Sequence, residues 1–528
     1  MASEFPLLDR SQQQAVLLPA ESRSALIAGA GSGKTTVLTV RAALVRKNAI
    51  NRTGTVLCLS YTNKAADEIG KRLLKLLSTE RAIRAFAPLE EEHPGIRQRF
   101  WNGTLHSFAK RVIEEITQHS VWWSLPPADR QRLAGVSSLY EACAYGDGRV
   151  SNILDESQAS ALWNRVTATL LPKTDVKRYD WPRRREDICS VWSSRQASQM
   201  IGYLPPAPLA IETYQQAVMH RWDHFDITQA EQAAGMAYQL EKQRQGVCDY
   251  DDLLCMAAAA LIYLPHLKEY YRKNLTHVLV DEAQDISFLD YVFLMSLPGF
   301  LHNGDDTVGY TLVGDPRQEI FDFRAGQPSL FSTLLQNNWA NDVQYLAVNY
   351  RSDNRIIALA GCVAQNPMLN MDYEPTDESA SRPRRGAGEG EVHWPSGMNK
   401  DRLESHIRRA VQHSMTQAYT SRVVLIRHKK NKPLVSSILH SIPGAHDAFE
   451  VSTFHSAKGG EWDHVILTGL GRGQFPSVPR FWRTAADNIR SESRVLYVGI
   501  TRAKHRVDIF ETEDGTFYPS IFRQGKLF

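Results

Sequence analysis

Residues 24–36 read Ser24-Ala-Leu-Ile-Ala28-Gly-Ala-Gly-Ser-Gly-Lys34-Thr-Thr36. A short apolar run, typical of a buried strand, leads into a glycine-rich turn and then into a helical pattern. Such glycines let backbone N–H groups converge on phosphate oxygens at a helix N-terminus, while Lys34 can neutralise the outer phosphates and the Thr35 hydroxyl can ligate Mg²⁺. Ala28 stands where the strict motif has its first glycine, so a chance glycine-rich turn is the alternative. The stretch predicts an α/β fold with a nucleotide site.

Further apolar runs of this kind follow along the chain, each bounded by turn-rich or charged residues. Runs of this length that alternate with helical patterns indicate buried parallel strands. They lie on both sides of Asn349-Tyr350-Arg351, at residues 55–59, 277–280 and 311–313, and at residues 422–426 and 464–467. We therefore expect an α/β fold with two cores, each built on a parallel sheet.

The stretch from residue 107 to residue 247 differs in composition from these cores. Strands are hard to find in it, and Trp, Gln, Arg and Ala dominate. We expect a mostly helical insertion that includes the basic run Arg183-Arg-Arg185. The first core then comprises residues 1–106 and 248–345, and the second comprises residues 346–528. Residues 374–391, rich in proline, glycine, arginine and acidic residues, are expected to form a mobile surface connection.

Composition excludes several classes of protein. The 528 residues are 43% hydrophobic and 23% charged with a net charge of +3, which is typical of a folded globular chain and names no polyanionic partner. The six cysteines are scattered without a CxxC pair, so neither a disulfide framework nor a zinc site is supported. The N-terminus lacks a signal pattern, and the longest apolar run, at residues 253–264, is shorter than the ~18 residues that span a bilayer. We expect a cytoplasmic protein without a membrane partner.

Charged residues at two kinds of position favour phosphoryl chemistry. Asp281 and Glu282 follow the apolar run Val278-Leu-Val280. In a nucleotide-hydrolysing enzyme the first carboxylate holds Mg²⁺ and the second takes the proton of the attacking water. Charge on the transferred phosphoryl group also needs positioned cations, and Arg351 and Arg502 are the candidates. The alternatives are a solvated acidic turn and ordinary surface salt bridges.

Many motifs in a fixed order give the chain a specific resemblance. It resembles the superfamily 1A DNA helicases of the UvrD/Rep/PcrA type over almost its whole length. Besides the phosphate loop and Asp281 to Asp285, the matching motifs are Leu8 to Val16 with Gln12, Ser60-Tyr-Thr-Asn-Lys-Ala-Ala66, Gly103-Thr-Leu-His-Ser107, Asp249-Tyr-Asp-Asp-Leu-Leu254, Val313-Gly-Asp-Pro-Arg-Gln318-Glu-Ile-Phe321-Asp-Phe323-Arg324, Asn349-Tyr-Arg-Ser352, Thr453-Phe-His-Ser-Ala-Lys458-Gly-Gly-Glu461-Trp462 and Glu492 to Ala503.

The resemblance implies two RecA-like P-loop cores that hold ATP and Mg²⁺ between them. Gln12 would read the adenine edge, Tyr350 would stack on the ring and Glu461 would touch the ribose. Thr35 and Asp281 would hold the metal, Glu282 would be the base, and Gln318 would sense the γ-phosphate. Lys34 would be joined in catalysis by Arg351 and Arg502 as arginine fingers. The phosphate-binding stretch would comprise Ala28, Gly29, Ala30, Gly31, Ser32, Gly33, Lys34, Thr35 and Thr36.

For DNA, the resemblance implies a track on which unpaired bases stack, since stacking tolerates any sequence. The aromatic and cationic residues of this track would be Tyr61, Phe321, Phe323 and Arg324, with Asn63, Lys64, His106 and His455 near the backbone. The family's direction of movement is 3′ to 5′. Single-stranded or partly duplex DNA is therefore the expected partner.

The chain also departs from the family pattern. Thr36 stands where many relatives have an arginine beside the adenine, Gly460 replaces a leucine, and Pro316-Arg317 replaces a more acidic pair. Relatives carry a regulatory domain, called 2B, after the strand that corresponds to residues 422–426. Here about 25 residues separate that strand from Thr453, so we expect 2B to be reduced or absent and the helical insertion, called 1B, to be retained.

These features predict an ATP-dependent translocase or helicase on single-stranded DNA. Compact chains of this type resemble the helicase-like subunit of Gabija anti-phage systems, which works with an OLD-family nuclease, and no motif is unique to that match. The alternatives are a DNA-end sensor or scaffold with a weak ATPase, and a DNA repair helicase.

Overall fold

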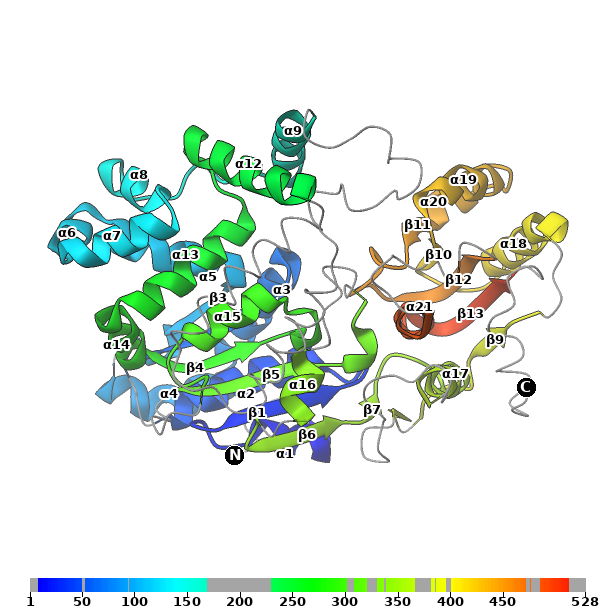
Figure 1. The fold of residues 1–528 in the computed structure, drawn as a ribbon. Coiled ribbons are helices and arrows are strands. Elements are labelled where there is room, and N and C mark those ends of the chain that lie inside the picture. Colours follow the sequence, from blue (N-terminus) through cyan, green and yellow to red (C-terminus); the bar gives the residue numbers. More distant parts are fainter. Residues whose placement is uncertain are drawn as a thin grey trace. The chain divides into compact units, whose positions relative to one another are not determined.

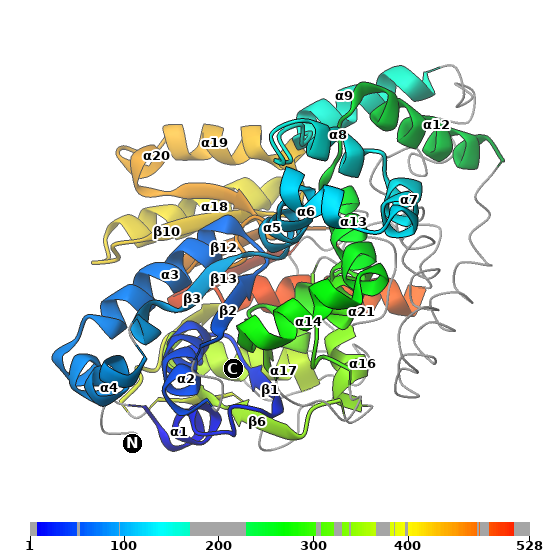
Figure 2. The ribbon, with the colours of Figure 1, turned by 90° about the vertical axis from the view of Figure 1, so that its left-hand side faces the viewer.

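The computed structural model describes residues 8–49, 53–93, 95–168, 229–301, 308–320, 330–336, 339–365, 381–384, 386–395, 400–471, 475 and 485–511 (Figures 1 and 2). The chain divides into two compact units. The N-terminal unit comprises Met1–Leu26, Thr35–Val313 and Phe323–Gln344, and the C-terminal unit comprises Ile27–Lys34, Gly314–Asp322 and Tyr345–Phe528. The glycine-rich loop and the segment after residue 313 thus pack with the second half of the chain.

The N-terminal unit is built on a six-stranded sheet in the order β3-β2-β4-β5-β1-β6. Strand β2 pairs in parallel with both β3 and β4, and β4 pairs in parallel with β5. The strands are β1 (Arg23–Ala28), β2 (Thr55–Ser60), β3 (Phe100–Thr104), β4 (Leu275–Val280), β5 (Gly309–Gly314) and β6 (Asp342–Leu346). Because β1, β4 and β5 are buried along their whole length, their sequences are apolar and do not alternate.

Helices surround this sheet (Figure 1). The apolar helices α13 (Tyr250–Tyr263) and α15 (Phe288–Ser296) bury most of their residues, whereas α3 (Asn63–Leu77) buries one face. The other helices are α1 (Arg10–Val16), α2 (Lys34–Asn48), α4 (Glu80–Glu92), α5 (Leu105–Thr117), α14 (Pro265–Asn274) and α16 (Leu330–Gln336).

Arg41 of α2 stabilises the chain that leads into β1. Its guanidinium group is fully buried and donates hydrogen bonds to the carbonyl oxygens of Leu18 and Pro19 at 3.0 and 3.2 Å. It also donates to the Thr311 hydroxyl at 2.7 Å. Burial lowers the pKa of Arg41 to about 10, which leaves it charged at neutral pH.

The described part of residues 107–247 is helical. It contains most of α5 and then α6 (His119–Ser124), α7 (Pro127–Val136), α8 (Leu139–Tyr145), α9 (Glu156–Thr167) and α12 (Gln229–Gln245). One isolated bridge joins Ile153 to Cys248. Residues 169–228, including Arg183 to Arg185, lie outside the described residues. The boundaries of the insertion remain a prediction.

The C-terminal unit has a five-stranded sheet in the order β11-β10-β12-β13-β9, and its neighbouring strands pair in parallel. Its strands are β9 (Glu391–His393), β10 (Arg422–Ile426), β11 (Glu450–Thr453), β12 (Trp462–Leu470) and β13 (Ala503–Glu511), and β7 (Val348–Asn349) pairs separately with β8 (Arg382–Pro383). The helices are α17 (Asn354–Gln365), α18 (Lys400–Met415), α19 (Lys432–His440), α20 (Ala445–Ala448) and α21 (Ala485–Ile500).

Alternate residues of β10 and β12 enter two separate apolar cores. Val423 and Leu425 pack in one core with residues of α17 and α21, and Val424 and Ile426 pack in the other with residues of α18 and α19. This alternation follows from the period of two in a strand. The sheet is therefore covered on both faces.

The predicted α/β fold with two parallel sheets is confirmed, and every predicted strand is present with bounds within three residues of those expected. The prediction missed β3, β6, β9, β11 and β13, and also the two-residue strands β7 and β8. Strand β13 mixes Lys504, Arg506 and Asp508 with apolar residues, so its pattern resembles a surface segment. Residues 427–449 form a short 3₁₀ turn and the helices α19 and α20. No helix among the described residues is long and apolar enough to cross a membrane.

Candidate functional site

The glycine-rich loop lies against the start of the second half of the chain. Gly31 and Gly33 have φ angles of 71° and 79°, which side-chain-bearing residues rarely adopt. The backbone N–H of Tyr350 donates to the carbonyl oxygen of Gly31 at 2.8 Å. A Cβ atom on Gly31 would lie 2.6 Å from Asn349 Oδ1 and 2.7 Å from Arg351 Cβ, so only glycine fits here.

Asn349 orders the turn that carries the first predicted arginine finger. Its Oδ1 accepts hydrogen bonds from the backbone N–H groups of Arg351 at 2.8 Å and Ser352 at 2.9 Å. Such an Asn-centred turn fixes the backbone locally. Asn349 belongs to the motif Asn349-Tyr-Arg-Ser352, in which only Tyr350 and Arg351 were predicted to have a role.

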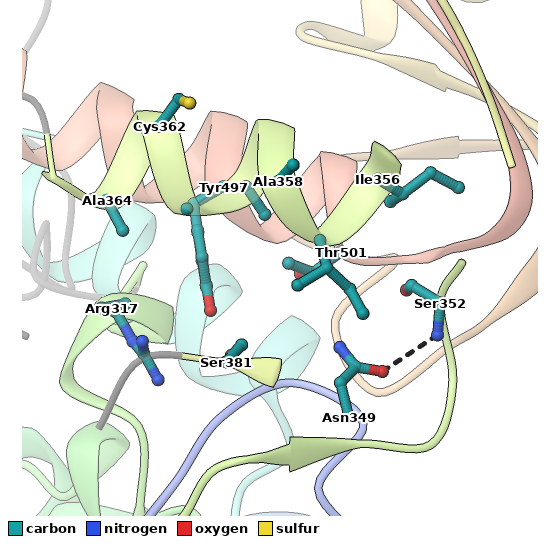
Figure 3. A pocket seen from close by; sticks show the side chains of 13 residues that line it. Arg317, Asn349, Ser352, Ile356, Ala358, Cys362, Ala364, Ser381, Tyr497 and Thr501 are labelled. Atoms are coloured by element: carbon teal, nitrogen blue, oxygen red, sulfur yellow. Dashed lines mark hydrogen bonds between the residues drawn. The ribbon is translucent and has the colours of Figure 1, made fainter. Parts of the chain in front are cut away.

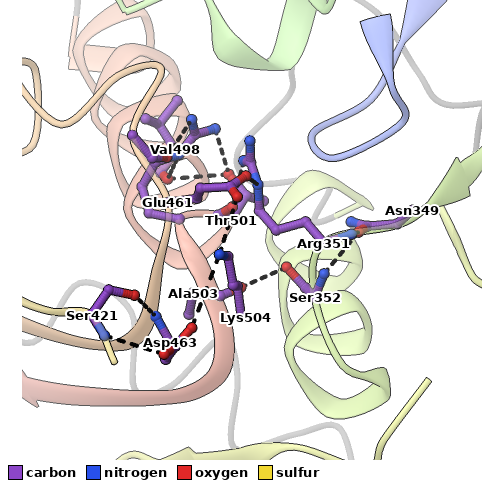
Figure 4. A network of polar contacts seen from close by, with 12 residues as sticks. Asn349, Arg351, Ser352, Ser421, Glu461, Asp463, Val498, Thr501, Ala503 and Lys504 are labelled. Atoms are coloured by element: carbon purple, nitrogen blue, oxygen red, sulfur yellow. Dashed lines mark hydrogen bonds and ion pairs between the residues drawn. The ribbon is translucent and has the colours of Figure 1, made fainter. Parts of the chain in front are cut away.

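Arg351 and Glu461 form an ion pair within the C-terminal unit (Figure 4). Arg351 Nε lies 2.8 Å from Glu461 Oε2, and Lys504 Nζ lies 3.1 Å from Glu461 Oε1. Burial alone would raise the pKa of Glu461, but the charges and hydrogen bonds of Arg351 and Lys504 outweigh it and lower the pKa. The residue predicted to touch the ribose thus pairs with the predicted arginine finger Arg351 and with Lys504.

Asp315 organises the segment that contains Gln318. The Asp315 carboxylate is fully buried and accepts from Arg317 Nε at 2.7 Å and from Gln318 Nε2 at 2.8 Å. Burial alone would raise its pKa, but the charges of Arg317 and Lys34 and these hydrogen bonds outweigh burial and lower the pKa. The carboxylate therefore stays ionised, and it connects the predicted γ-phosphate sensor with the lysine of the phosphate loop electrostatically.

Arg502 joins this group from the turn after α21. Its Nη2 donates to Gln318 Oε1 at 3.1 Å and to Thr501 Oγ1 at 3.2 Å. Arg351 Nη1 donates to the carbonyl oxygen of the same Thr501 at 3.1 Å (Figure 4). Thr501 therefore lies between the two predicted arginine fingers. Its signal in the sequence is weak, because a threonine beside an arginine is common.

In the N-terminal unit, Asp281 and Glu282 follow directly on β4. The backbone N–H of Asp281 donates to the Leu59 carbonyl oxygen of β2 at 2.9 Å, and its side chain is 5% exposed. Glu282 has φ 52° and ψ 44° and is the one non-glycine residue with positive φ in the described part of the chain. Such a conformation costs about 1–3 kcal/mol and is concentrated at functional sites. Gln284 donates to the Glu282 carboxylate at 2.5 Å.

Gln12 is held by the cap of α1. The Asp9 carboxylate accepts from the Gln12 backbone N–H at 2.9 Å, and Gln12 Oε1 accepts from the Asp9 N–H at 3.2 Å. This capping box fixes the orientation of the predicted adenine reader. Nearby in the sequence, Thr36 Oγ1 is 3.5 Å from Arg72 Nη1 of α3. Arg72 thus contacts the threonine that the sequence comparison with the family places at an arginine position.

The donor set fits a magnesium site. Thr35 offers a hydroxyl oxygen at the start of α2, and Asp281 offers a buried carboxylate at the end of β4. Mg²⁺ prefers such oxygen ligands and keeps several waters, so one or two protein ligands suffice. In Figure 1 the arrows of β1, β4 and β5 point the same way, so the phosphate loop and Asp281 leave the sheet at one edge.

The register of β2 and β3 brings together predicted DNA-facing residues from two motifs. Ser60 pairs with Thr104 at the ends of these strands, so Tyr61 and His106 follow neighbouring strand ends. Asn63 and Lys64 begin α3 and are exposed. Phe321, Phe323 and Arg324 lie outside the described residues, and His455 belongs to the C-terminal unit.

The structure adds Tyr250 to this edge. Its ring contacts the His106 ring edge-on at a centroid distance of 5.3 Å, and the residue is 50% exposed. Tyr250 lies in the motif Asp249-Tyr-Asp-Asp-Leu-Leu254, but no role was predicted for it. The available signal in the sequence was an aromatic residue at the start of a motif, directly after Asp249.

A cavity of about 240 Å³ lies within the C-terminal unit (Figure 3). Arg317, Asn349, Ser381 and Tyr497 line its polar side, and residues of α17 such as Ile356 line its apolar side. It lies close to the phosphate loop, since a Cβ on Gly29 would be 2.9 Å from Ser381 Oγ.

A phosphate loop after one strand of a parallel sheet and a carboxylate pair after another define the P-loop class of nucleotide-binding proteins. Comparison with known families agrees with this class. Residues 8–338 match the UvrD/REP helicase N-terminal domain, and residues 434–513 match the UvrD-like helicase C-terminal domain. The chain belongs to the UvrD-like helicase family, and its two parallel sheets are the family's RecA-like cores.

Individual relatives are similar at low identity. DNA helicase II of Salmonella typhimurium is 27% identical over 360 residues, which are 68% of this chain and 40% of the relative. ATP-dependent DNA helicase UvrD1 of Mycobacterium tuberculosis is 27% identical over 67% of this chain and 39% of the relative. ATP-dependent DNA helicase srs2 of Schizosaccharomyces pombe is 25% identical over 73% of this chain and 36% of the relative. The alignments thus span about two fifths of these relatives.

Proposed function

We propose that the protein is an ATP-dependent translocase or helicase that moves 3′ to 5′ on single-stranded DNA. The observation that carries the proposal is the group around Asp315. There, Gln318 contacts Arg502 at 3.1 Å, and Lys34 acts on the same carboxylate. Three residues from separate motifs, each predicted to contact phosphate, thus gather around one buried carboxylate. Membership of the UvrD-like family supports the same activity.

The proposed chemistry follows from charge and geometry. Lys34, Arg351 and Arg502 stabilise the negative charge on the transferred phosphoryl group, and Gln318 reports its presence to Arg502. Glu282, held by its backbone conformation and by Gln284, accepts a proton from the attacking water. Mg²⁺, when held by Thr35 and Asp281, would neutralise phosphate charge.

The proposed DNA track uses stacking and backbone contacts. Tyr61 and His106 at the ends of β2 and β3, with Tyr250 beside them, offer aromatic faces to unpaired bases. Lys64 offers a positive charge to a phosphate. Such contacts tolerate any base sequence, which a translocase needs.

ATP turnover with and without single-stranded DNA tests the activity. We expect DNA to stimulate turnover and Lys34→Ala to abolish it, because the phosphate loop loses its charge. Lys47→Ala, at the other end of the same helix α2, is the matched control and should behave as wild type. Equal turnover in wild type and Lys34→Ala would contradict the site assignment.

We further propose that the protein works in the cytoplasm with an OLD-family nuclease in anti-phage defence. The short connection of residues 427–449, which holds only α19 and α20, supports this. A motor with little or no 2B domain needs control from elsewhere, and a partner subunit supplies it. Purification of the tagged chain together with the product of the adjacent gene tests the pairing. A neighbouring gene that encodes no nuclease, or a nuclease that does not co-purify, would contradict it.

A further inference from the structure

Three consecutive side chains fasten the segment after Asp315 to α21 and the turn that follows it. The guanidinium carbon of Arg317 lies 5.6 Å from the centroid of the Tyr497 ring. Gln318 Oε1 accepts from Arg502 at 3.1 Å. Glu319 Oε2 lies 3.4 Å from Arg494 Nη1. All these residues belong to the C-terminal unit, so their contacts are internal to one compact body.

Arg317 links three parts of the unit. It forms an ion pair with Asp315 at 2.7 Å and faces the ring of Tyr497 on α21. Its Nη2 also packs against the phosphate loop, since a Cβ atom on Gly29 would lie 3.0 Å away. Arg317 and Tyr497 both line the cavity of Figure 3. At 3% exposure, the guanidinium contacts the ring with little competition from water.

Glu319 and Arg494 form a second link. Their side chains are 8% and 6% exposed, so the pair lies in a low dielectric. Removal of either partner would leave an uncompensated buried charge, which is strongly unfavourable. The pair therefore fixes Glu319 relative to α21. Together the two links hold Gln318 in place between them.

The same segment is connected to the predicted DNA-facing turn. Lys458 Nζ donates to the carbonyl oxygen of Gln318 at 2.7 Å. Lys458 follows His455 by three residues in that turn. A displacement of the turn is therefore passed to Gln318 only if Gln318 is held firmly on its other sides.

We propose that Arg317 and Glu319 are positioning residues that couple DNA binding to ATP hydrolysis. They hold Gln318 against Arg502, so that movement of the turn with His455 and Lys458 reaches the hydrolytic residues. Neither residue contacts ATP or DNA in this scheme. The inference rests on the proposed function, because it assumes DNA-stimulated turnover.

The first test removes the charge of Glu319. In Glu319→Gln we expect stimulation of ATP turnover by oligo-dT to fall about tenfold, while basal turnover and the Kd for fluorescent oligo-dT stay within about twofold. The matched control is Glu492→Gln. Glu492 lies on α21, the helix that carries Arg494, and forms another buried ion pair, with Arg427 at 2.5 Å. The control should lose stability while its stimulation ratio is unchanged. Unchanged stimulation in Glu319→Gln, or an equal loss of stimulation in the control, would overturn the proposal.

The second test examines the ring under Arg317. Tyr497→Phe keeps the aromatic face and should stimulate as wild type, whereas Tyr497→Leu should lose about as much stimulation as Glu319→Gln. The double variant Glu319→Arg with Arg494→Glu restores opposite charges and should regain part of the stimulation of ATP turnover. It keeps the test decisive if one of the single variants folds poorly. A melting temperature recorded for each variant separates lost coupling from lost folding. If Tyr497→Leu stimulates as wild type, Arg317 has no coupling role.

The DNA stimulation of the wild-type protein distinguishes failure of the proposed function from failure of the coupling proposal. If oligo-dT does not stimulate its turnover, the proposed function fails and the coupling proposal fails with it. If the wild type is stimulated and the variants are stimulated equally, only the coupling proposal is overturned.

Discussion

The C-terminal unit contains two buried polar networks that differ in how their groups are paired. Around Arg502, side chains from separate motifs meet, and several bonds go to backbone carbonyls such as those of Val498 and Gly460. Around His464, the groups pair mainly with one another. His464 Nε2 lies 2.5 Å from Asp508 Oδ2, and its Nδ1 lies 2.8 Å from Ser414 Oγ.

The second network looks like a hydrolase triad, with a serine, a histidine and an aspartate in contact. Yet all three residues are fully buried in strands β12 and β13 and helix α18, where no substrate reaches them. Arg506 completes the pairing through two hydrogen bonds to Asp508. Burial and ionic contacts alone therefore do not mark a functional site. A functional site is instead marked by polar groups that lie in loops and come from several motifs.

The largest expected effect is on catalysis. Arg502→Lys keeps a charge but cannot donate to Gln318, Thr501 and Val498 at once. We expect kcat for DNA-stimulated ATP hydrolysis to fall by about 10³-fold, the range of other arginine fingers, with a melting temperature close to that of wild type. Steady-state kinetics and a thermal melt check both. A large fall in melting temperature with a normal kcat would mean that the network around Arg502 serves stability and not catalysis.

Asp508→Asn should have the opposite profile. It removes the charge that pairs with Arg506 and His464 inside the sheet, and breaking such a buried pair costs about 3–5 kcal/mol. Denaturant unfolding should show this loss. At low temperature, turnover per folded molecule should match wild type within about twofold, and a selective loss of turnover would assign the His464 network a role in catalysis.

The pH dependence of stability examines the His464 network further. Burial lowers the pKa of His464 below its ordinary value and outweighs the raising effect of Asp508. The unfolded chain therefore binds a proton that the folded chain does not, so this stability is present above about pH 6.5 and is lost as pH falls below it. We expect the free energy of unfolding to fall as pH drops below about 6.5, with a slope of up to about 1.4 kcal/mol per pH unit. Unfolding of His464→Gln, compared with wild type, should show a shallower slope.

The pKa of His277 in the N-terminal unit is lowered in the same way as that of His464. Burial, and then the charge of Arg41, lower its pKa well below the ordinary value. Its two ring nitrogens contact the Ala20 carbonyl oxygen and the Thr311 hydroxyl at 2.6 and 2.8 Å. The slope that remains in His464→Gln should therefore fall further in a variant that also carries His277→Gln.

The smallest expected effect concerns DNA. Lys64 and Lys75 lie at opposite ends of α3, and only Lys64 follows the end of β2 beside Tyr61. We expect Lys64→Ala to weaken single-stranded DNA binding a few-fold and to reduce the slope of log Kd against log salt by about 1. Lys75→Ala should change neither quantity. Equal effects of both variants would mean that position at the strand end does not select the contact.

Much of the fold followed from local pattern. The runs of β1, β4, β5, β10 and β12 are apolar because both faces of each sheet are covered, and this makes them visible in the sequence. Strand β13 was missed because its charged residues find partners only in the folded unit, as Arg506 does with Asp508. Likewise Gln318 could be named from its motif, whereas the contacts of its neighbours Arg317 and Glu319 with Tyr497 and Arg494 form only when α21 packs against this segment.

The sequence by itself determined the family, the most apolar buried strands of each core and the residues of the phosphate loop, because these depend on short-range spacing and on residue type. Only the tertiary structure decided that the phosphate loop packs with the C-terminal unit, that Thr501 lies between Arg351 and Arg502, and that Glu319 pairs with Arg494. Such contacts join residues that are far apart in the chain. They depend on how helices and sheets pack, which no local pattern encodes.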